Sequence, residues 1–290
     1  GGPAGGRGHP GASGGTGGGR LAGWVPVTGI YDDPWAYELA CSFRDVPAEV
    51  DALLGWTVRH RSSGAAARTV LELAAGPAEH AREFARRGLA ATALDLHPAM
   101  CAYADQQAKE RGLELDVVQE DMTSFALGRR FDLVVTMLDS TSHLMTLDAF
   151  VAHLDRTADH LNADGLYVLE MSHPRDRLTD APSVSTGWTV EHDGPGGRVE
   201  ATVRWGEPTD RLDPVTQIAD DHVTMTITKP DAPVRVIRDV VPYRFWTATE
   251  LSAAIRLSGA LETVAQYGDF GDVALTDADA WRMITVLRRT

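Results

Sequence analysis

Short apolar runs alternate with amphipathic stretches between residues 69 and 171, which indicates a succession of strands and helices. Strands are predicted at 69–73, 90–95, 115–119, 131–138 and 165–171. Helices are predicted at 78–87, 98–111 and 147–161, and the second has Pro98 at its start and Gly112 just past its end. Because helices and strands alternate, we expect a parallel sheet covered by helices.

The pattern changes after Pro174. Four segments carry β-branched residues in partial alternation and are separated by turn residues, which predicts an antiparallel sheet; they lie at 186–192, 197–206, 216–228 and 233–243. A helix at 247–258 and strands at 261–267 and 282–288 then return the chain to the core. The predicted fold class is therefore α/β, a doubly wound, mostly parallel seven-stranded sheet with an antiparallel β insertion after the fifth strand.

The N-terminal region is predicted to have two parts. Residues 1–22 are rich in glycine and poor in apolar side chains, so we expect a disordered tail. Residues 23–60 are expected to form a helical lid, in which a helix from Pro47 to about His60 has an apolar stripe of Val50, Leu53, Leu54 and Val58. The remaining boundaries assign 61–175 and 245–290 to the core and 176–244 to the insertion.

Charge and cysteine content narrow the function. Lys and Arg number 27 against 41 Asp and Glu, and the formal net charge of −14 argues against binding of nucleic acid through phosphate contacts. No apolar run approaches the ~20 residues of a membrane helix. Cys41 and Cys101 fit a reducing compartment. We expect a cytoplasmic protein without nucleic-acid or membrane partners, and we leave a homo-oligomer open.

A candidate ligand site lies where the first two predicted strands end. The segment Val70-Leu71-Glu72-Leu73-Ala74-Ala75-Gly76-Pro77-Ala78-Glu79-His80 runs from a strand with an acid near its end, through small residues, into a helix. Asp95 ends the next strand. The carboxyl ends of neighbouring parallel strands form the ligand crevice of such sheets, and small residues allow close approach to the backbone. We therefore expect a nucleotide-like cofactor, with Asp95 on its ribose hydroxyls.

Four motifs in order make the chain similar to class I S-adenosylmethionine-dependent methyltransferases, from about Tyr31 to Arg289. The first is Glu72-Leu73-Ala74-Ala75-Gly76-Pro77-Ala78, in which Ala74 and Ala78 replace two glycines of the family pattern. The others are Leu94-Asp95-Leu96-His97-Pro98-Ala99-Met100, Glu120-Asp121-Met122 and a segment that ends at Met137-Leu138-Asp139-Ser140. The resemblance implies a Rossmann-like fold and S-adenosyl-L-methionine as the cofactor.

The resemblance also implies which residues hold the cofactor. Asp121 would bind the adenine amine, and Met122 would pack on the adenine ring. Tyr31 and Arg44 belong to a segment that folds over the cofactor in related enzymes, where a guanidinium suits the methionine carboxylate. The full predicted set is Tyr31, Arg44, Glu72, Ala74, Gly76, Asp95, Leu96, Asp121, Met122 and Leu138.

The antiparallel insertion is similar to that of methyltransferases that act on small molecules, such as sugar N-methyltransferases and glycine-type N-methyltransferases. A small-molecule substrate would then lie between the insertion and the end of the fifth strand. His143 is the first candidate for a base and Glu170 the second, because both lie at or just after strand ends. Substrate contacts are expected from His173, Tyr243 and Trp246, and no residue spacing indicates a metal.

The acceptor and the atom that receives the methyl group stay open at this stage. N-methylation is favoured and O-methylation follows, while C-methylation of a prenyl diphosphate or another small carbon nucleophile, with Glu170 as base, is an alternative. Outside this class, the alternatives are a nicotinamide-dependent oxidoreductase and a non-catalytic protein that binds S-adenosylmethionine. Against a dinucleotide, the loop lacks Gly-x-Gly-x-x-Gly, and Glu79 would repel a phosphate at the start of the helix.

Overall fold

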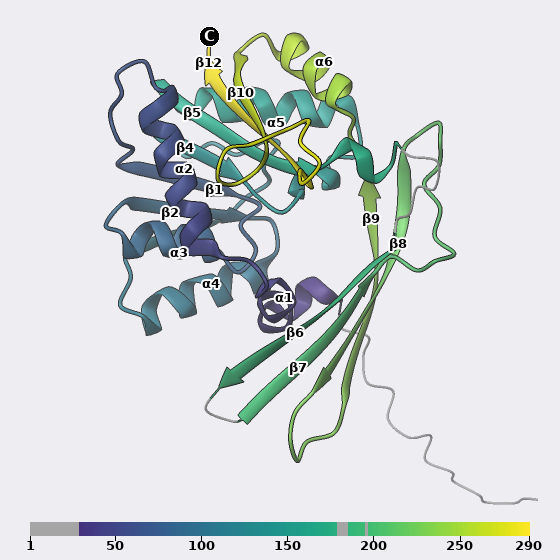
Figure 1. The fold of residues 1–290 in the computed structure, drawn as a ribbon. Coiled ribbons are helices and arrows are strands. Elements are labelled where there is room, and N and C mark those ends of the chain that lie inside the picture. The colour runs from purple at the N-terminus through teal and green to yellow at the C-terminus, as the bar shows by residue number, and fades with distance from the viewer. Residues whose placement is uncertain (1–28, 179–184, 195–196) are drawn as a thin grey trace, which may run out of the picture.

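The computed structural model describes residues 29–178, 185–194 and 197–290, which form a central sheet and a second sheet beside it (Figure 1). The central sheet has the strand order β11-β10-β12-β5-β4-β1-β2-β3. Its parallel strands are β1 (Thr69–Leu73), β2 (Ala90–Asp95), β3 (Leu115–Gln119), β4 (Phe131–Thr136) and β5 (Leu161–Ser172). Its antiparallel strands are β10 (Leu261–Asp269), β11 (Val273–Ala274) and β12 (Arg282–Arg289). The α/β class and the mostly parallel sheet are thus confirmed.

The strand count differs from the prediction, because the central sheet has eight strands where the sequence indicated seven. The extra strand, β11, is two residues long and pairs with β10 at the sheet edge. A pair of residues is too short to produce a recognisable alternation of apolar and polar positions. The glycine-rich tail predicted over residues 1–22 lies outside the described residues.

Helices cover both faces of the central sheet, and the alternation of side chains along each strand separates two cores. On one face, α2 (Val46–His60) and α3 (Glu79–Arg86) pack with Leu133 and Val135 of β4. On the other, α5 (Leu147–Asp159) and α6 (Ala248–Ser258) pack with Tyr167 and Leu169 of β5. Helix α4 (Pro98–Glu110) contacts β2 and β3. This layering leaves the carboxyl ends of β1, β2, β3 and β4 open to a ligand.

Helix α2 was predicted to belong to a lid, but it packs in the core of the sheet. Asp45 caps its start by accepting a hydrogen bond from the Ala48 amide, and Val50, Leu53 and Trp56 are buried against the strands. The predicted stripe was partly wrong, because Val58 is half exposed while Trp56 is buried. Spacing identified an apolar face, but it could not distinguish a helix that covers a ligand from one that covers a sheet.

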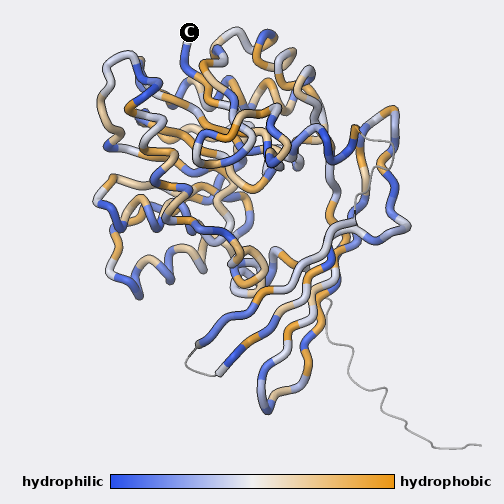
Figure 2. Tube along the Cα trace, in the orientation of Figure 1, coloured by the Kyte–Doolittle hydropathy of each residue, from blue (hydrophilic) through white to orange (hydrophobic). Residues whose placement is uncertain are grey.

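The insertion forms a separate four-stranded antiparallel sheet, β6 (Thr186–Gly194), β7 (Gly197–Trp205), β8 (Ile218–Thr228) and β9 (Arg235–Arg244), in sequence order. Its strands change repeatedly between polar and apolar residues (Figure 2), as the sequence pattern predicted. Between this sheet and the core lies α1 (Pro34–Cys41), whose Ala36, Leu39 and Ala40 pack on the sheet's inner face (Figure 1). In the described part of the chain, no helix is long and apolar enough to cross a membrane.

Candidate functional site

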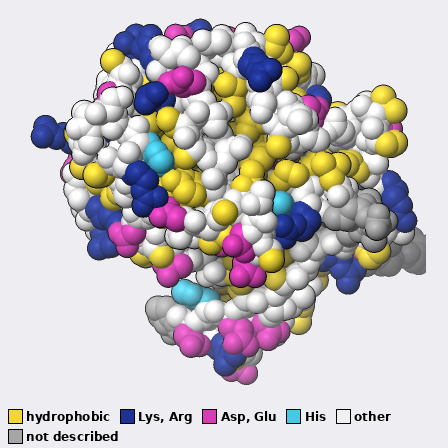
Figure 3. Space-filling model, turned by 45° about the horizontal axis from the view of Figure 1, so that its top comes forward, with side chains coloured by type: hydrophobic (Ala, Val, Ile, Leu, Met, Phe, Trp, Pro, Cys, Tyr) yellow, Lys and Arg dark blue, Asp and Glu magenta, His cyan; other side chains and the backbone are white. Residues whose placement is uncertain are grey.

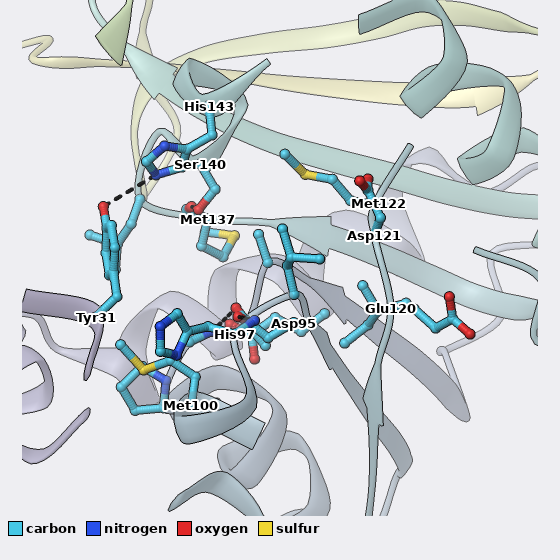
Figure 4. A pocket seen from close by; sticks show the side chains of 18 of the residues that line it. Tyr31, Asp95, His97, Met100, Glu120, Asp121, Met122, Met137, Ser140 and His143 are labelled. Carbon is cyan, nitrogen blue, oxygen red and sulfur yellow. Dashed lines mark hydrogen bonds between the residues drawn. The ribbon is translucent and has the colours of Figure 1, made fainter. Parts of the chain in front are cut away.

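All ten predicted cofactor residues line one cavity of about 560 Å³, here called the strand-end cavity. Figure 4 labels Tyr31, Asp95, Asp121 and Met122 among them. It opens above the carboxyl ends of β1, β2, β3 and β4, as the topology of a parallel sheet requires. The short helix η1 (Ile30–Asp32) and α1 close it on one side with Tyr31 and Tyr37. Residues from four motifs that are distant in the sequence therefore meet in one place.

The loop between β1 and α3 turns sharply beneath this cavity. Ala74, Gly76 and Ala78 all have positive φ angles, of 51°, 53° and 60°. The Gly76 amide points at Asp95 and donates a hydrogen bond of 2.7 Å to its Oδ2 atom, while the His97 amide donates to Oδ1 at 2.8 Å. The Asp95 carboxylate is thereby fixed in orientation, and its burial raises its pKa. A fixed, desolvated carboxylate suits a vicinal diol.

The opposite end of the cavity is apolar with one oriented acid. Leu96 is 64% exposed and lines the cavity together with Met122, which suits the two faces of a flat base. Asp121 accepts hydrogen bonds of 2.7 Å from both the amide and the hydroxyl of Thr123, so its carboxylate is held in place. These residues fit the adenosine part of S-adenosylmethionine.

The charge of the cavity suits a cation better than a diphosphate. Among the described residues that line it, Arg44 is the only Arg or Lys. Glu79 stands at the start of α3, where burial and then the neighbouring Glu38 raise its pKa to about 7. A phosphate at this helix end would meet an acid rather than free amides. A ligand with a sulfonium and an amino group fits these surroundings.

A buried ion network borders the cavity and joins α2, α3, β1, β5 and β12. Arg44 donates to Glu49 at 2.7 and 3.0 Å and to Glu170 at 2.8 and 3.0 Å. His80 lies between Glu49, at 2.8 Å, and Glu72, at 3.5 Å. Arg282 completes the network through Glu49 and Glu170. Three acids thus face three groups that carry positive charge when His80 is protonated.

The network changes the roles predicted for Glu170 and Arg44. Glu170 is buried, accepts bonds from Arg44 and from the Leu138 amide at 3.1 Å, and faces Arg282. Burial alone would raise its pKa, but the two arginines lower it, so the carboxylate stays charged and engaged and is a poor base. Four of the five N–H donors of Arg44 already bind Glu49 and Glu170, which leaves one for the predicted cofactor carboxylate.

A second cavity of about 510 Å³, here called the insertion cavity, lies between the core and the four-stranded sheet. Apolar side chains gather in a band near the middle of the face shown in Figure 3, with charged side chains around them. Aromatic residues form much of the cavity wall: Tyr31, Tyr37, Phe43, Trp188, Trp205, Tyr243 and Trp281. The two cavities share Tyr31, Tyr37, Arg44, Leu138, Ser140 and His143, so they meet at these residues.

His143 stands at this junction, on the short helix η2 (Ser140–His143) that follows β4. Its Nε2 atom lies 3.2 Å from the Tyr31 hydroxyl, and the two rings meet edge to face with centroids 5.7 Å apart (Figure 4). Desolvation lowers the pKa of His143 and raises that of Tyr31. At neutral pH the pair therefore consists of a neutral imidazole and a protonated phenol.

Two of the predicted substrate residues do not face either cavity. Trp246 is buried in the core against Phe150, with its indole N–H bonded to the Leu144 carbonyl at 3.1 Å. His173 is buried and binds the Leu275 carbonyl at 3.0 Å, while its other nitrogen accepts a bond from the Arg175 amide. Both residues are structural. Tyr243, the third, does line the insertion cavity.

Sequence reasoning missed three aspartates of the insertion cavity, Asp139, Asp176 and Asp221. Asp139 follows β4 with φ of 55° and accepts a 2.5 Å bond from the Ser172 hydroxyl; its burial raises its pKa to about 7. Asp221 lies on β8 at a position where the alternation places an inward side chain. Asp221 could have been identified in the sequence, because it is an acid within a row of alternating apolar residues. Asp139 could not, because its sequence surroundings are those of an ordinary turn residue.

Comparisons with known proteins agree with this geometry. Residues 70–165 match the family described as "Methyltransferase domain". The chain is 28% identical, over 204 residues, to the dTDP-3-amino-3,4,6-trideoxy-alpha-D-glucopyranose N,N-dimethyltransferase of Streptomyces venezuelae, an alignment that covers 69% of this chain and 78% of the relative. It is 33% identical, over 153 residues, to the dTDP-3-amino-3,6-dideoxy-alpha-D-glucopyranose N,N-dimethyltransferase of Streptomyces fradiae, with 52% of this chain and 57% of the relative covered.

The fold is also found among solved structures. The sugar N-methyltransferase KedS8 from Streptoalloteichus superimposes with a TM-score of 0.65 at 22% sequence identity, over 98% of this chain and 100% of that one. At this identity the likeness concerns the fold, and it extends through the insertion as well as the core.

Proposed function

Because the chain is a class I S-adenosylmethionine-dependent methyltransferase, we propose that it methylates an amino group of a small, sugar-like acceptor held in the insertion cavity. The observation that carries this proposal is the pairing of His143 with Tyr31 where the strand-end cavity and the insertion cavity meet. Both named relatives are sugar N,N-dimethyltransferases, which supports a sugar as the carrier of the amine.

Binding and orientation are the main tasks of the residues in the strand-end cavity. S-adenosylmethionine, when bound, supplies a methyl group on a positively charged sulfur. Asp95 would hold the ribose diol, Asp121 and Met122 the adenine, and the backbone of Leu138 would lie beside the methionine part. Holding donor and acceptor in line converts an encounter in solution into a step within one complex, which can be worth about 7–11 kcal/mol.

The proton chemistry of the junction favours nitrogen over oxygen as the acceptor atom. An amine must lose a proton from its ammonium form before it can attack, and a neutral imidazole of lowered pKa can accept that proton. An amine is the easier acceptor for this imidazole, because an ammonium group is far more acidic than an alkyl hydroxyl. Tyr31 keeps its proton and can hold the imidazole in position through the 3.2 Å contact.

The charges of the insertion cavity also oppose C-methylation of a prenyl diphosphate. Asp139, Asp176 and Asp221 line this cavity, and of its three arginines, Arg44 and Arg282 already pair with Glu49 and Glu170. A diphosphate would therefore enter a cavity in which carboxylates outnumber guanidinium groups.

The test uses the purified chain, S-adenosylmethionine and the two dTDP-amino sugars named for the relatives. We expect mass spectrometry to detect the addition of one or two methyl groups to the amine. His143→Ala should lower kcat by roughly 100- to 10,000-fold with unchanged binding of S-adenosylhomocysteine. Asp95→Ala should instead abolish that binding in calorimetry. His192→Ala, an exposed position on β6, is the control.

Two results would contradict the proposal. One is methyl transfer to a sugar hydroxyl while the amine stays unmodified. The other is tight binding of S-adenosylhomocysteine with no transfer to any amino sugar, which would indicate a different acceptor class.

A further inference from the structure

An acid occupies an inward position on the inner face of the insertion sheet. Every second residue of β8 from position 219 to position 227 is buried. Four of these five residues are apolar (Ala219, Val223, Met225 and Ile227), and the fifth is Asp221. Asp221 is 1% exposed, and within the described residues its Oδ1 atom has no hydrogen-bond partner. Its strand neighbours Asp220 and His222 point outward and are exposed.

Such an arrangement is costly for the folded protein. A buried polar group left without a hydrogen-bond partner lowers the stability of the folded state, and more so when it is charged. A β-branched apolar residue would suit the same position, because the register pairs Asp221 with the buried Val241 of β9. A group that weakens the fold in this way is characteristic of residues kept for binding.

The surroundings of Asp221 direct it toward the acceptor. It lines the insertion cavity together with Trp188, Trp205 and Tyr243, and this cavity ends at His143 and Tyr31. Desolvation is the main cause of the raised pKa of Tyr31, and the charge of Asp221 adds to it. Burial raises the pKa of Asp221 to about 6, while the neighbouring Arg177 lowers it, so the carboxylate is largely charged at neutral pH.

We propose that Asp221 is a recognition residue that accepts a hydrogen bond from a ring hydroxyl of the acceptor, at the side of the sugar opposite the nitrogen that is methylated. This inference rests on the proposed function, because it assigns the methylated nitrogen to His143. The aromatic walls would hold the apolar faces of the sugar, and Asp221 would fix its rotation. An acceptor without that hydroxyl would leave the buried carboxylate unpaired and would be rejected.

The test compares Asp221→Val with Asp220→Val, which makes the same change one residue earlier on the outward face of β8. With dTDP-3-amino-3,6-dideoxy-α-D-glucopyranose as the probe, we expect Asp221→Val to raise the acceptor KM by roughly 10- to 100-fold, as for the loss of one hydrogen bond to a charged group. The values of kcat and of the Kd for S-adenosylhomocysteine should change by less than about threefold. Asp221→Asn, which keeps an oxygen acceptor, should have a smaller effect on KM.

Stability separates recognition from a structural role. We expect Asp221→Val to unfold at a higher denaturant concentration than the wild type, because a buried carboxylate whose Oδ1 atom lacks a hydrogen-bond partner is replaced by an apolar side chain. An acceptor KM within twofold of the wild type, or an equal rise for Asp220→Val, would overturn the proposal. If the wild type methylates no amino sugar, the proposed function fails, and the role of Asp221 is then decided by the stability comparison alone. A less stable Asp221→Val variant would show that Asp221 supports the fold and would overturn its recognition role.

Discussion

Ala74 and Ala78 hold backbone angles that glycine adopts more easily. Their φ angles of 51° and 60° lie in the left-handed region, where a Cβ atom crowds the backbone at a cost of roughly 1–2 kcal/mol. These are the two positions at which alanine replaces glycine in the family pattern. The turn therefore keeps its shape because the surrounding contacts, such as the bond from Gly76 to Asp95, impose it.

Ala74→Gly is expected to stabilise the protein by roughly 0.5–1 kcal/mol, because the relief of strain exceeds the added flexibility of the unfolded chain. Chemical denaturation with a fixed slope would measure the change. The matched control is Ala75→Gly, whose φ is not positive and which should therefore destabilise by a similar amount. Shifts of the same sign in both variants would show that the turn stores no strain at Ala74.

The sequence predicted which residues lie at strand ends, but it did not predict the directions in which their side chains point. Glu72, Asp95 and Asp121 reach one cavity because topology alone gathers the carboxyl ends of parallel strands. Trp246 and His173 lie close to strand ends too, yet both turn into the core. Whether a side chain points to a ligand or to a neighbouring helix depends on tertiary packing, and the spacing of residues in one sequence does not predict that packing.

One buried network joins α2, α3, β1, β5 and β12, and His80 is its titratable centre. Burial alone would lower the pKa of His80, but hydrogen bonds to Glu49 and Glu72 raise it to about 9. A group whose folded pKa exceeds its unfolded value stabilises fully below the unfolded pKa, near 6.5, and loses that effect as pH rises through the folded value. The network should therefore weaken in mildly alkaline solution.

We expect the free energy of unfolding to fall by roughly 2–3 kcal/mol between pH 7 and pH 10, and this loss should be absent in His80→Gln. Glu79 and Asp139, whose pKa values are raised to about 7, titrate mainly below this window. Denaturant curves at several pH values would measure the slope, with the exposed His192→Gln as control. An unchanged slope in His80→Gln would assign the pH dependence to other groups.

The sequence predicted where helices and strands begin and end better than it predicted which elements they pack against. Strands β6 to β9 begin and end within two residues of the predicted segments, because one-sided burial imposes an alternation that the sequence shows. The assignment of α2 to a lid was wrong, because α2 packs on the central sheet. An amphipathic pattern predicts that one face of a helix is buried, but it does not identify the element that buries it.

The two sheets of the molecule share no strand, and α1 is one of the elements that join them. One side of α1 packs on the insertion sheet, and Trp188 of β6 donates a 2.7 Å bond to the Ala40 carbonyl. On the other side, Glu38 accepts a 2.6 Å bond from Arg82 of α3 and a bond from Tyr103 of α4. Tyr37 of the same helix lines both cavities, so the path from cofactor to acceptor depends on this junction.

If α1 couples the two sheets, a substitution that weakens its packing should increase local opening on both sides of the junction. Leu39 is 5% exposed and lies in the insertion-sheet core, so Leu39→Ala should cost about 2–4 kcal/mol. Hydrogen exchange followed by mass spectrometry would then show faster exchange in peptides from β6–β9 and also in peptides from α3 and α4, because opening at α1 releases Glu38 from both helices. Leu257→Ala makes the same change at a position that is 63% exposed on α6 and should alter neither set. Faster exchange confined to β6–β9 would mean that the insertion opens by itself and that α1 stays docked on the core.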